Sequence, residues 1–346
     1  MADRIEKPGD GSPAVASSFW TGRPVLVTGA AGFIGSHLTE ALVHAGASVR
    51  AFVRYNSRND YGWLEAIDPE TLHDVEIFRG DLTNPDAVFG GAQGCNTILH
   101  LGALIPIPYS YQHPREFVAA NVVGTLNILE AARRLDVSRV IHTSSSEVYG
   151  TALRVPIDEQ HPLHPQSPYA ATKVGADQLA LSFRHSFDTP VAIVRPFNTF
   201  GPRQTARAVI PTIISQALSR DVIELGSTST TRDFVYVGDT VGGMMRCAEV
   251  DAALGEVINL GTGIEISIAD VVERVARLVE RDVPIKVTSD RLRPVDSEVE
   301  RLVADPQKAE ALLGWKPHVE FEEGLRRTIE WMRGSLSAFK PAIYNV

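Results

Sequence analysis

A short apolar segment that runs into a glycine-rich turn and then a helical pattern is the strongest constraint on how this chain folds. The apolar segment covers residues 24–28, and the turn covers residues 29–35, with glycine at its first, fourth and seventh positions. Apolar residues then recur at helical spacing until Gly46, a typical helix end. Glycines in this context let the backbone approach a pyrophosphate at the helix N-terminus, although a tight turn without a ligand has the same pattern. The sequence therefore predicts a dinucleotide site formed by Gly29, Gly32, Phe33, Ile34 and Gly35.

The alternation of strand and helix continues along the first half of the chain. Further apolar runs predict strands over residues 49–53, 75–78, 97–101, 140–143 and 191–194, and helical patterns cover 114–135 and 169–187. Strands that alternate with helices form a parallel sheet covered on both faces. The predicted fold class is α/β, a doubly wound parallel sheet of Rossmann type with a smaller C-terminal α/β lobe.

Two strand ends carry residues suited to the dinucleotide. Asp81 follows the third strand, beside Leu82, and could reach an adenine amino group. Leu101 and Ala103 follow the fourth strand in a segment of small residues that lets a cofactor lie close. Both segments fit ordinary turn chemistry equally well.

Composition and charge exclude several classes of function. The formal net charge is −9, without a Lys/Arg cluster, which argues against a nucleic-acid surface. Cys95 and Cys247 are too few for a disulfide scaffold or a Cys-rich metal site. No apolar run reaches membrane-spanning length, and the N-terminus lacks the apolar region of a signal peptide. We expect a cytoplasmic protein that binds no metal, nucleic acid or membrane.

The chain divides into three predicted parts. Residues 1–18 are rich in Gly, Pro, Ser and charge and are predicted to be a disordered tail. Residues 19–195 form the predicted dinucleotide-binding domain. Residues 196–346 form mainly the substrate lobe, with some segments returning to the first domain. A strand and turn at residues 258–263 are predicted to close the lobe.

A tyrosine and a lysine form a candidate catalytic pair. Tyr169 and Lys173 lie four residues apart in a helical pattern that begins at Ser167 and Pro168, a plausible cap and first-turn proline. An ammonium one turn away would favour the phenolate and lower the pKa of Tyr169, so that it could accept a proton from an alcohol. The bare spacing also occurs on many solvated helices.

With these motifs together, the chain resembles the extended short-chain dehydrogenase/reductases that act on nucleotide sugars, from Trp20 to the final helix. The resemblance implies that Ser145 joins Tyr169 and Lys173 at the reacting alcohol, and that Lys173 also holds the nicotinamide ribose. It places Asn121 in the active-site hydrogen-bond network, although Asn121 could equally be a buried amide that braces two helices. Pro196 would contact the cofactor.

The resemblance also implies a substrate site in the second half. Residues 195–198 and 201–203 look like the family's bridge between the cofactor and the sugar nucleotide. Arginines suit a diphosphate because the planar guanidinium binds its oxygens in pairs. The implied substrate-binding residues are Asn198, Arg203, Val209, Arg232 and Arg293.

The segment before Val148-Tyr149-Gly150 indicates which member of the family this is. It reads Ser145-Ser146-Glu147, similar to the acid-containing segment of the 4,6-dehydratases, whereas related epimerases usually lack the acid. Other segments look most like N-acetylamino-sugar 4,6-dehydratases of legionaminic-acid-type pathways. UDP-glucuronate decarboxylases also carry a Ser-Glu pair, so decarboxylase and 4-epimerase remain alternatives. A non-catalytic dinucleotide-binding sensor is the alternative of another class, but sensors tend to lose the tyrosine or lysine.

The resemblance implies a mechanism, a cofactor and an oligomeric state. Tyr169 would take the C4 hydroxyl proton while hydride passes to the nicotinamide, and Ser145 would hold the C4 oxygen. Glu147, two residues beyond Ser145 on a segment expected to be extended, would remove the C5 proton, and Ser146 or water would assist water loss from C6. NAD is the expected cofactor, although NADP is possible because Arg54 stands where NAD sites usually carry an acid. We expect a homodimer that pairs the helices at 114–135 and 169–187 through Val118, Val122, Leu126, Leu179 and Phe183.

Overall fold

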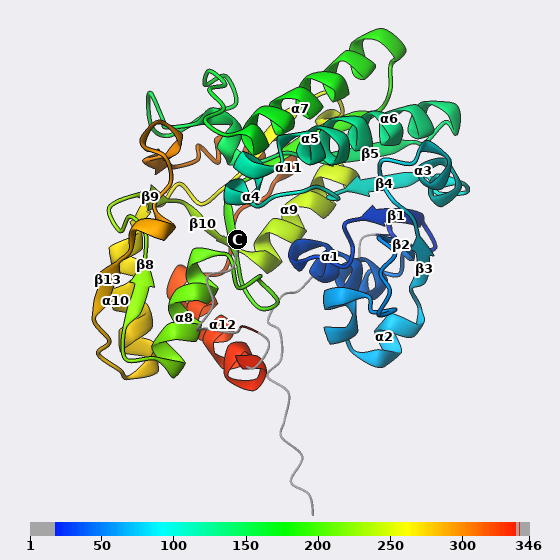
Figure 1. Ribbon diagram of the computed structural model, residues 1–346. Coiled ribbons are helices and arrows are strands. Elements are labelled where there is room, and N and C mark those ends of the chain that lie inside the picture. The colour runs from blue at the N-terminus through cyan, green and yellow to red at the C-terminus, as the bar shows by residue number, and fades with distance from the viewer. Residues whose placement is uncertain (1–17, 337–338, 340–346) are drawn as a thin grey trace, which may run out of the picture.

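A seven-stranded parallel sheet forms the centre of the molecule (Figure 1). The computed structural model describes residues 18–336 and 339, so nearly all of the predicted N-terminal tail lies outside the described residues. The strand order is β11-β6-β5-β4-β1-β2-β3, which confirms the predicted doubly wound sheet. The strands are β1 (Pro24–Thr28), β2 (Ser48–Val53), β3 (Glu76–Arg79), β4 (Thr97–His100), β5 (Arg139–Thr143), β6 (Val191–Pro196) and β11 (Val257–Leu260).

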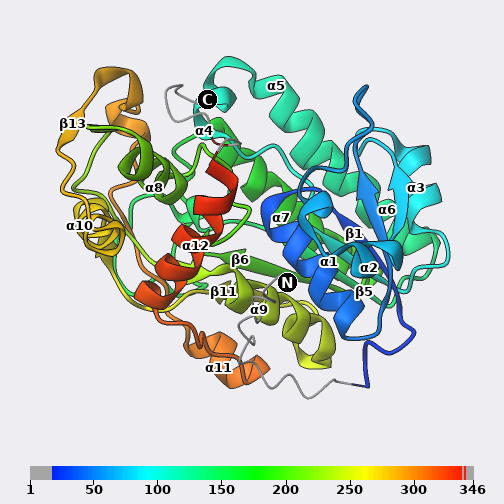
Figure 2. The same cartoon turned by 90° about the horizontal axis from the view of Figure 1, so that it is seen from below.

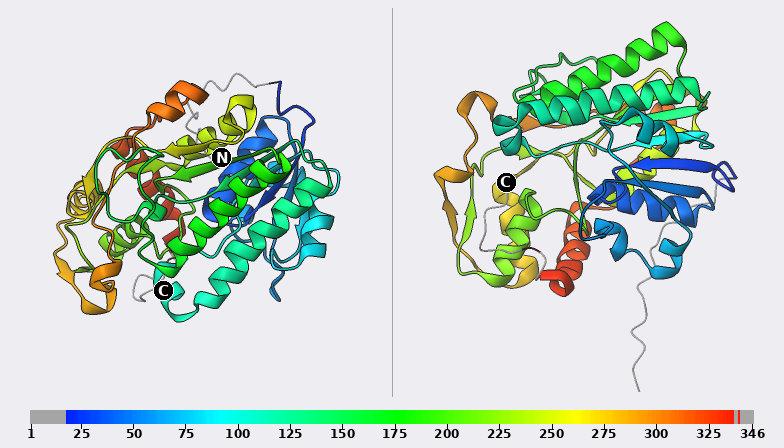
Figure 3. Two further views of the ribbon diagram at one scale, coloured as in Figure 1. Left: turned by 90° about the horizontal axis from the view of Figure 1, so that it is seen from above. Right: turned by 45° about the vertical axis from the view of Figure 1, so that its right-hand side comes forward.

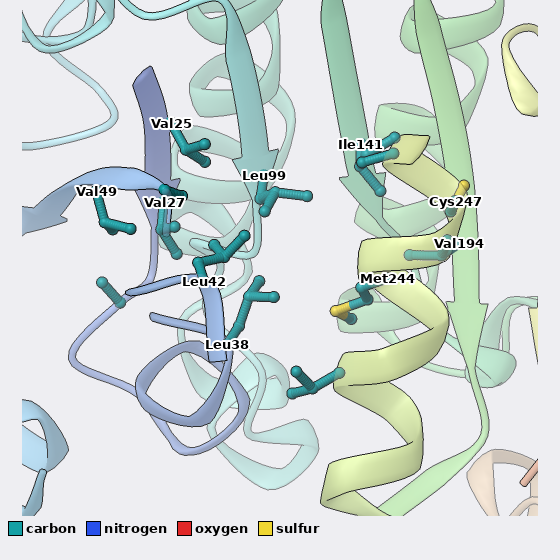
Figure 4. Close-up of a cluster of buried hydrophobic side chains, with 14 of the residues drawn as sticks. Val25, Val27, Leu38, Leu42, Val49, Leu99, Ile141, Val194, Met244 and Cys247 are labelled. Atoms are coloured by element: carbon teal, nitrogen blue, oxygen red, sulfur yellow. The ribbon is translucent and has the colours of Figure 1, made fainter. Parts of the chain in front are cut away.

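Alternate side chains of the strands pack against two layers of helices. On one face, Val25 and Val27 join α1 (Phe33–His44) and α9 (Val237–Glu249), as Figure 4 shows. On the other face, Leu26 packs with α3 (Pro85–Ala92), α6 (Gly124–Arg134) and α7 (Pro168–Phe187). Figure 2 looks onto the first layer. Because helices cover both faces of the sheet, its strands have the nearly continuous apolar runs seen in the sequence.

The strand β11 corrects the prediction for residues 258–263. It pairs with β6, with Ile258 opposite Val194, and so extends the central sheet instead of closing the lobe. Ile258 and Leu260 are fully buried and join the cluster under α9. The helix α11 (Gln307–Leu313) also packs in this cluster. A strand so thoroughly buried belongs to a covered sheet edge rather than to a small surface lobe.

The helix predicted at 114–135 has an irregular first half. It begins as α5 (Pro114–Phe117), widens into a π-helical turn over Val118–Val123, and continues as α6. Two shorter helices are α2 (Pro69–His73) and α4 (Ile107–Gln112). None of the helices in the described part of the chain is long and apolar enough to cross a membrane.

A smaller lobe packs beside the carboxyl ends of the sheet strands (Figures 1 and 3). Its core lies between α8 (Val209–Ser219), α10 (Ile268–Val279) and α12 (Phe321–Ser335). Its strands form three small sheets, which are β7 (Asn198–Phe200) with β10 (Phe234–Tyr236), β8 (Ile223–Leu225) with β13 (Ile285–Val287), and β9 (Thr231–Arg232) between β12 (Ile266–Ser267) and β14 (Arg301–Leu302). The functional side chains lie between this lobe and the sheet.

Candidate active site

The glycine turn after β1 lies at the switch point of the sheet, where β1 and β4 are neighbours. Gly29 has a φ of +69°, and a Cβ there would lie 2.8 Å from the backbone nitrogen of Gly102. A Cβ on Gly35 would lie 2.1 Å from the carbonyl oxygen of Gly29, so only glycine lets α1 approach the turn this closely. In open α/β sheets, ligands bind at this crevice outside the carboxyl ends of the strands.

The N-terminus of α1 fits a dinucleotide pyrophosphate. Gly32 is the N-cap and offers no side-chain hydrogen bond to the first turn, which also contains no acidic residue. Backbone N–H groups at such an end can bind an anion, and the helix dipole favours negative charge there. Gly32, Phe33 and Ile34 therefore lie where the sequence predicts phosphate contacts.

Two further segments border this end of the sheet. Thr28 Oγ1 accepts a hydrogen bond from Gly102 N (3.0 Å), which fixes the loop that carries Leu101 and Ala103. Leu82 packs against Gly102, where a Cβ would lie 2.6 Å from Leu82 Cδ1. The structure thus gathers Leu82, Leu101 and Ala103 near the glycine turn.

Asp81 and Arg54 are surface residues in this structure. Asp81 Oδ1 accepts hydrogen bonds from the backbone N–H (2.8 Å) and hydroxyl (2.7 Å) of Thr83, which is turn chemistry. These bonds lower the pKa of Asp81, and the charge of Arg54 adds to the effect. Arg54 is exposed just beyond β2, so the structure puts a cation and no acid at that strand end.

The catalytic pair and the serine converge beside β5. Ser167 caps α7 by accepting a hydrogen bond from Ala170 N (3.1 Å), and Pro168 occupies the first turn, as predicted. Tyr169 is hydrogen-bonded to Ser145, and Lys173 Nζ donates to the carbonyl oxygen of Thr143 (2.6 Å). Serine and tyrosine hydroxyls held together in this way can share one substrate oxygen.

The predicted direction of the Tyr169 pKa shift is wrong for this structure. Burial raises the pKa of Tyr169 to about 12, and the hydrogen bond from Ser145 only partly offsets it. Burial also lowers the pKa of Lys173 to about 8. Both charged forms lose hydration in this site, and that loss outweighs the benefit of helical spacing.

Asn121 acts as a brace. Its Nδ2 donates to the carbonyl oxygen of Leu104 (2.9 Å) and to Thr172 Oγ1 (3.0 Å), while its Oδ1 accepts from Leu104 N (2.7 Å). The side chain is buried within the π-helical turn. It therefore ties the loop after β4 to α7 beside the pair, which matches the bracing alternative.

Glu147 reaches the substrate side of the site by a route that the sequence did not predict. Ser146–Tyr149 is a 3₁₀ turn rather than an extended segment, because Ser145 Oγ caps it by accepting from Glu147 N (3.2 Å). The orientation of the Glu147 side chain is therefore not set by the alternation of side chains along a β-strand. Ser146 is buried, whereas Glu147 is half-buried and lines the main cavity.

That cavity has a volume of about 570 Å³ and lies between the sheet and the lobe. Of the predicted substrate residues, Asn198, Val209, Arg232 and Arg293 line it. The Asn198 Oδ1 atom is buried and accepts no hydrogen bond from the described residues. Arg207 and Arg291, which the sequence analysis did not single out, also line the wall.

The cavity wall carries four arginines, which outnumber its three acidic residues. Arg232 Nη2 and Arg293 Nη1 both lie 3.7 Å from Glu298 Oε1, so one carboxylate serves two guanidinium groups at long range. Burial lowers the pKa of Arg232, while the negative charge of Glu147 opposes that shift. The wall suits a ligand with more than one negative charge.

Arg203 does not line the cavity. Its Nη2 forms an ion pair with Glu40 Oε2 on α1 (2.8 Å), and its backbone has a φ of +64°. The sequence places Arg203 in a substrate segment, but the long-range contact with α1 turns the side chain toward the dinucleotide domain. Pro196 ends β6 just before Asn198.

Comparisons with known proteins match this chain to nucleotide-sugar dehydratases and epimerases. The model of the GDP-mannose 4,6-dehydratase family matches residues 26–328. A UDP-glucose 4-epimerase of Mycolicibacterium smegmatis is 35% identical over 315 residues, covering 89% of this chain and 98% of that protein. A dTDP-D-glucose 4,6-dehydratase of Mus musculus is 30% identical over 324 residues, covering 92% of this chain and 91% of that protein.

A solved structure of a nucleotide-sugar epimerase also matches this fold. The UDP-glucuronic acid 4-epimerase of Bacillus cereus, solved with UDP-glucuronic acid and NAD, superposes with a TM-score of 0.82 at 28% identity. The match covers 90% of this chain and 99% of the other. Relatives of this chain therefore include both dehydratases and epimerases.

Proposed function

Because this chain belongs to the GDP-mannose 4,6-dehydratase family of extended short-chain dehydrogenase/reductases, an enzyme family that acts on nucleotide sugars, we propose that it is an NAD-dependent nucleotide-sugar 4,6-dehydratase. The proposed product is a 4-keto-6-deoxy sugar that is still attached to its nucleotide. An N-acetylamino sugar, as the sequence resemblance suggests, stays a prediction.

The observation that carries the proposal is the position of Glu147. Its carboxylate lines the cavity, and its backbone N–H is bonded to Ser145, the hydroxyl partner of Tyr169. A base so close to the alcohol-oxidising pair can address the carbon next to the oxidised one. Only elimination across C5 and C6 needs such a base, since the C5 proton becomes acidic once C4 is a ketone.

The dinucleotide is proposed to lie across the turn at Gly29–Gly35, with Lys173 at the nicotinamide ribose and Asn121 bracing the loop beneath it. Leu82, Leu101, Ala103 and Pro196 would border it, and Asp81 and Arg54 would face its adenosine end. When bound there, NAD would supply a hydride acceptor for C4 oxidation and a hydride donor for C6. The retained cofactor balances the reaction, so no external oxidant is needed.

Each side chain then has one task. Tyr169 takes the proton of the C4 hydroxyl, Ser145 holds the C4 oxygen, and Glu147 removes the C5 proton. Ser146 or water donates a proton to the leaving C6 oxygen. Arg232 and Arg293 in the cavity wall are proposed to bind the diphosphate, with Asn198 and Val209 between it and the sugar. Arg203 would act only indirectly, through α1.

A nucleotide-sugar 4-epimerase is the second candidate, because close relatives include epimerases and the same tyrosine and lysine would serve. A UDP-glucuronate decarboxylase would also share them. The test is incubation with a panel of nucleotide sugars and measurement of product mass. A dehydratase product is lighter by water, a decarboxylase product is lighter by carbon dioxide, and an epimerase product has unchanged mass.

The bound cofactor is expected to be NAD. Arg54 is exposed and Asp81 is engaged by Thr83, so neither side chain is built into a closed phosphate pocket. Denaturation of purified protein followed by mass spectrometry should release NAD, and Arg54→Ala should retain it. Recovery of NADP from the wild type, with loss of the cofactor in Arg54→Ala, would contradict this prediction.

The protein is expected to form a homodimer through the outer face of α5, the π-helical turn and α6. Val118 and Val123 are exposed there, in a shallow groove with Pro114, Arg115 and Ala119. Phe183, which was expected in this seam, packs instead into the core beneath α7. Exposed apolar side chains gathered on one helical face are typical of an interface.

Light scattering at micromolar concentration should give twice the mass of one chain. Val118→Asp should shift the mass toward the monomer, whereas Leu153→Asp, at an exposed apolar position that does not line this groove, should leave it unchanged. A monomeric wild type would refute the prediction.

A further inference from the structure

One helical turn beyond Lys173, α7 carries an aspartate with no access to solvent. Asp177 Oδ2 accepts hydrogen bonds from Ser144 Oγ (2.8 Å) and from Arg195 Nε (3.1 Å) and Nη2 (2.9 Å). Its Oδ1 lies 3.4 Å from His142 Nε2 and forms no hydrogen bond to the described residues. Burial of this carboxylate costs free energy because the charge loses its hydration. The mechanism proposed above does not use Asp177.

The surroundings keep Asp177 charged and leave the two nearby histidines neutral. Although burial opposes ionisation, the contact with His142 and the charges of Arg195 and Lys173 hold the pKa of Asp177 below its usual value. Burial lowers the pKa of His100 and His142, and the charge of Lys173 lowers both further.

The groups that face Lys173 therefore come from four elements. They are Tyr169 and Asp177 on its own helix, His100 on β4, His142 on β5 and, behind Asp177, Arg195 on β6. Asp177 is the acid whose charge acts on Lys173, and it opposes the effect of burial. The charge of Glu147, and less strongly that of Asp177, raises the pKa of Tyr169.

Tyr169 and Lys173 must lose one proton between them before the pair can accept one from substrate. The remaining proton can sit on the lysine, which leaves a basic phenolate, or on the tyrosine, which leaves a neutral amine and no base at C4. Along the helix axis Asp177 is about 6 Å from Lys173 and about 12 Å from Tyr169, so its charge favours the first arrangement.

We propose that Asp177 is a positioning residue that shifts this proton toward Lys173 and so favours Tyr169 as the base. Arg195 opposes it by partly neutralising the carboxylate, while its Nη1 donates to Tyr149 (2.9 Å) and anchors the array in the core. The inference rests on the proposed use of Tyr169 and Lys173 in C4 oxidation, but not on elimination at C5.

The direct test is a pH titration of lysine side chains by NMR. The chain contains only six lysines, so a protein labelled with ¹³C at lysine Cε gives few signals, and Lys173→Arg identifies the one of interest. Asp177→Asn should move the midpoint of Lys173 to lower pH, and Arg195→Gln should move it to higher pH. Opposite shifts follow from charge alone, whereas a merely structural role predicts no shift of that midpoint in either variant.

The kinetic counterpart is the reduction of bound NAD by a nucleotide sugar, read from the absorbance of reduced nicotinamide. At pH 8, Asp177→Asn should slow this step by about tenfold or more, since one pKa unit is a tenfold change in the protonated fraction. The loss should shrink as pH falls, Asp177→Glu should restore much of the rate, and sugar-nucleotide affinity should stay within about twofold of wild type.

If Asp177→Asn does not fold, the NMR titration of Arg195→Gln tests the proposal by itself, because the titration midpoint of Lys173 must move to higher pH in that variant. Unchanged Lys173 midpoints, or shifts of both variants in the same direction, would overturn the proposal. Failure of water elimination would not affect it, since cofactor reduction at C4 is common to dehydratase and epimerase chemistry.

Discussion

Replacement of Tyr169 by phenylalanine is expected to lower turnover by about two orders of magnitude or more, the usual scale for loss of a general base. The ring can keep its edge contact with Phe117, so folding should be preserved. The lost hydroxyl is the one bonded to Ser145, and the nearby Lys173 cannot replace it because its Nζ is held by the Thr143 carbonyl. Steady-state rates and a thermal melt would measure both effects.

Binding should survive the same change. NAD and sugar-nucleotide affinities, measured by calorimetry, are expected to stay near those of the wild type, because the glycine turn and the arginine wall are untouched. Tyr61→Phe is the control, since the Tyr61 hydroxyl binds Arg79 on the surface (2.6 Å). Near-normal turnover of Tyr169→Phe would rule out Tyr169 as the base.

Glu147→Gln is expected to separate the two halves of the reaction. The amide keeps the shape of the side chain and the backbone N–H bond to Ser145, but it cannot accept a proton from C5. Loss of water should therefore fall by about 10²–10⁴-fold, while reduction of the bound cofactor by substrate continues. Rapid mixing with a nucleotide hexose should show reduced nicotinamide accumulating without product.

The matched control is Glu273→Gln on the exposed face of α10, which should behave as wild type. A Glu147→Gln variant that dehydrates normally would remove Glu147 from the mechanism. A variant that cannot reduce the cofactor at all would assign Glu147 to C4 chemistry or to sugar binding instead.

Features determined by local spacing were predictable from the sequence. Gly29 and Gly35 stand at fixed intervals after a strand because backbone contacts within the same turn require them. Tyr169 and Lys173 share a helix face through their spacing alone. The six strands expected in the first half follow from runs that are apolar on both faces, and the structure confirms all of them.

Features determined by contacts distant in sequence were not predictable. Arg203 turns away from the cavity because Glu40, far away in the sequence, lies on α1. The 3₁₀ turn that places Glu147 depends on a cap by Ser145 that resembles strand continuation in the sequence. Burial of Tyr169, which reverses the expected pKa shift, depends on packing against Ile107 of α4 and Phe117 of α5.

The spacing of Asp177 carried a signal that the sequence analysis did not use. Lys173 and Asp177 are four residues apart on one helix, the same interval as the catalytic pair. What the spacing could not reveal is that the aspartate is sealed from solvent and bonded to Arg195 from β6. Such a residue is distinguishable from a surface ion pair only in the folded structure.

Turnover in deuterated water with a panel of nucleotide hexoses, followed by mass spectrometry and proton NMR of the product, distinguishes dehydration from epimerisation and decarboxylation. We expect a 4-keto-6-deoxy sugar that carries deuterium at C5, because Glu147 exchanges the proton that it removes from C5 with solvent before a proton returns to that carbon. Epimerised product without deuterium at C5, or carbon dioxide release from a uronic acid with no 6-deoxy sugar from any hexose, would contradict it.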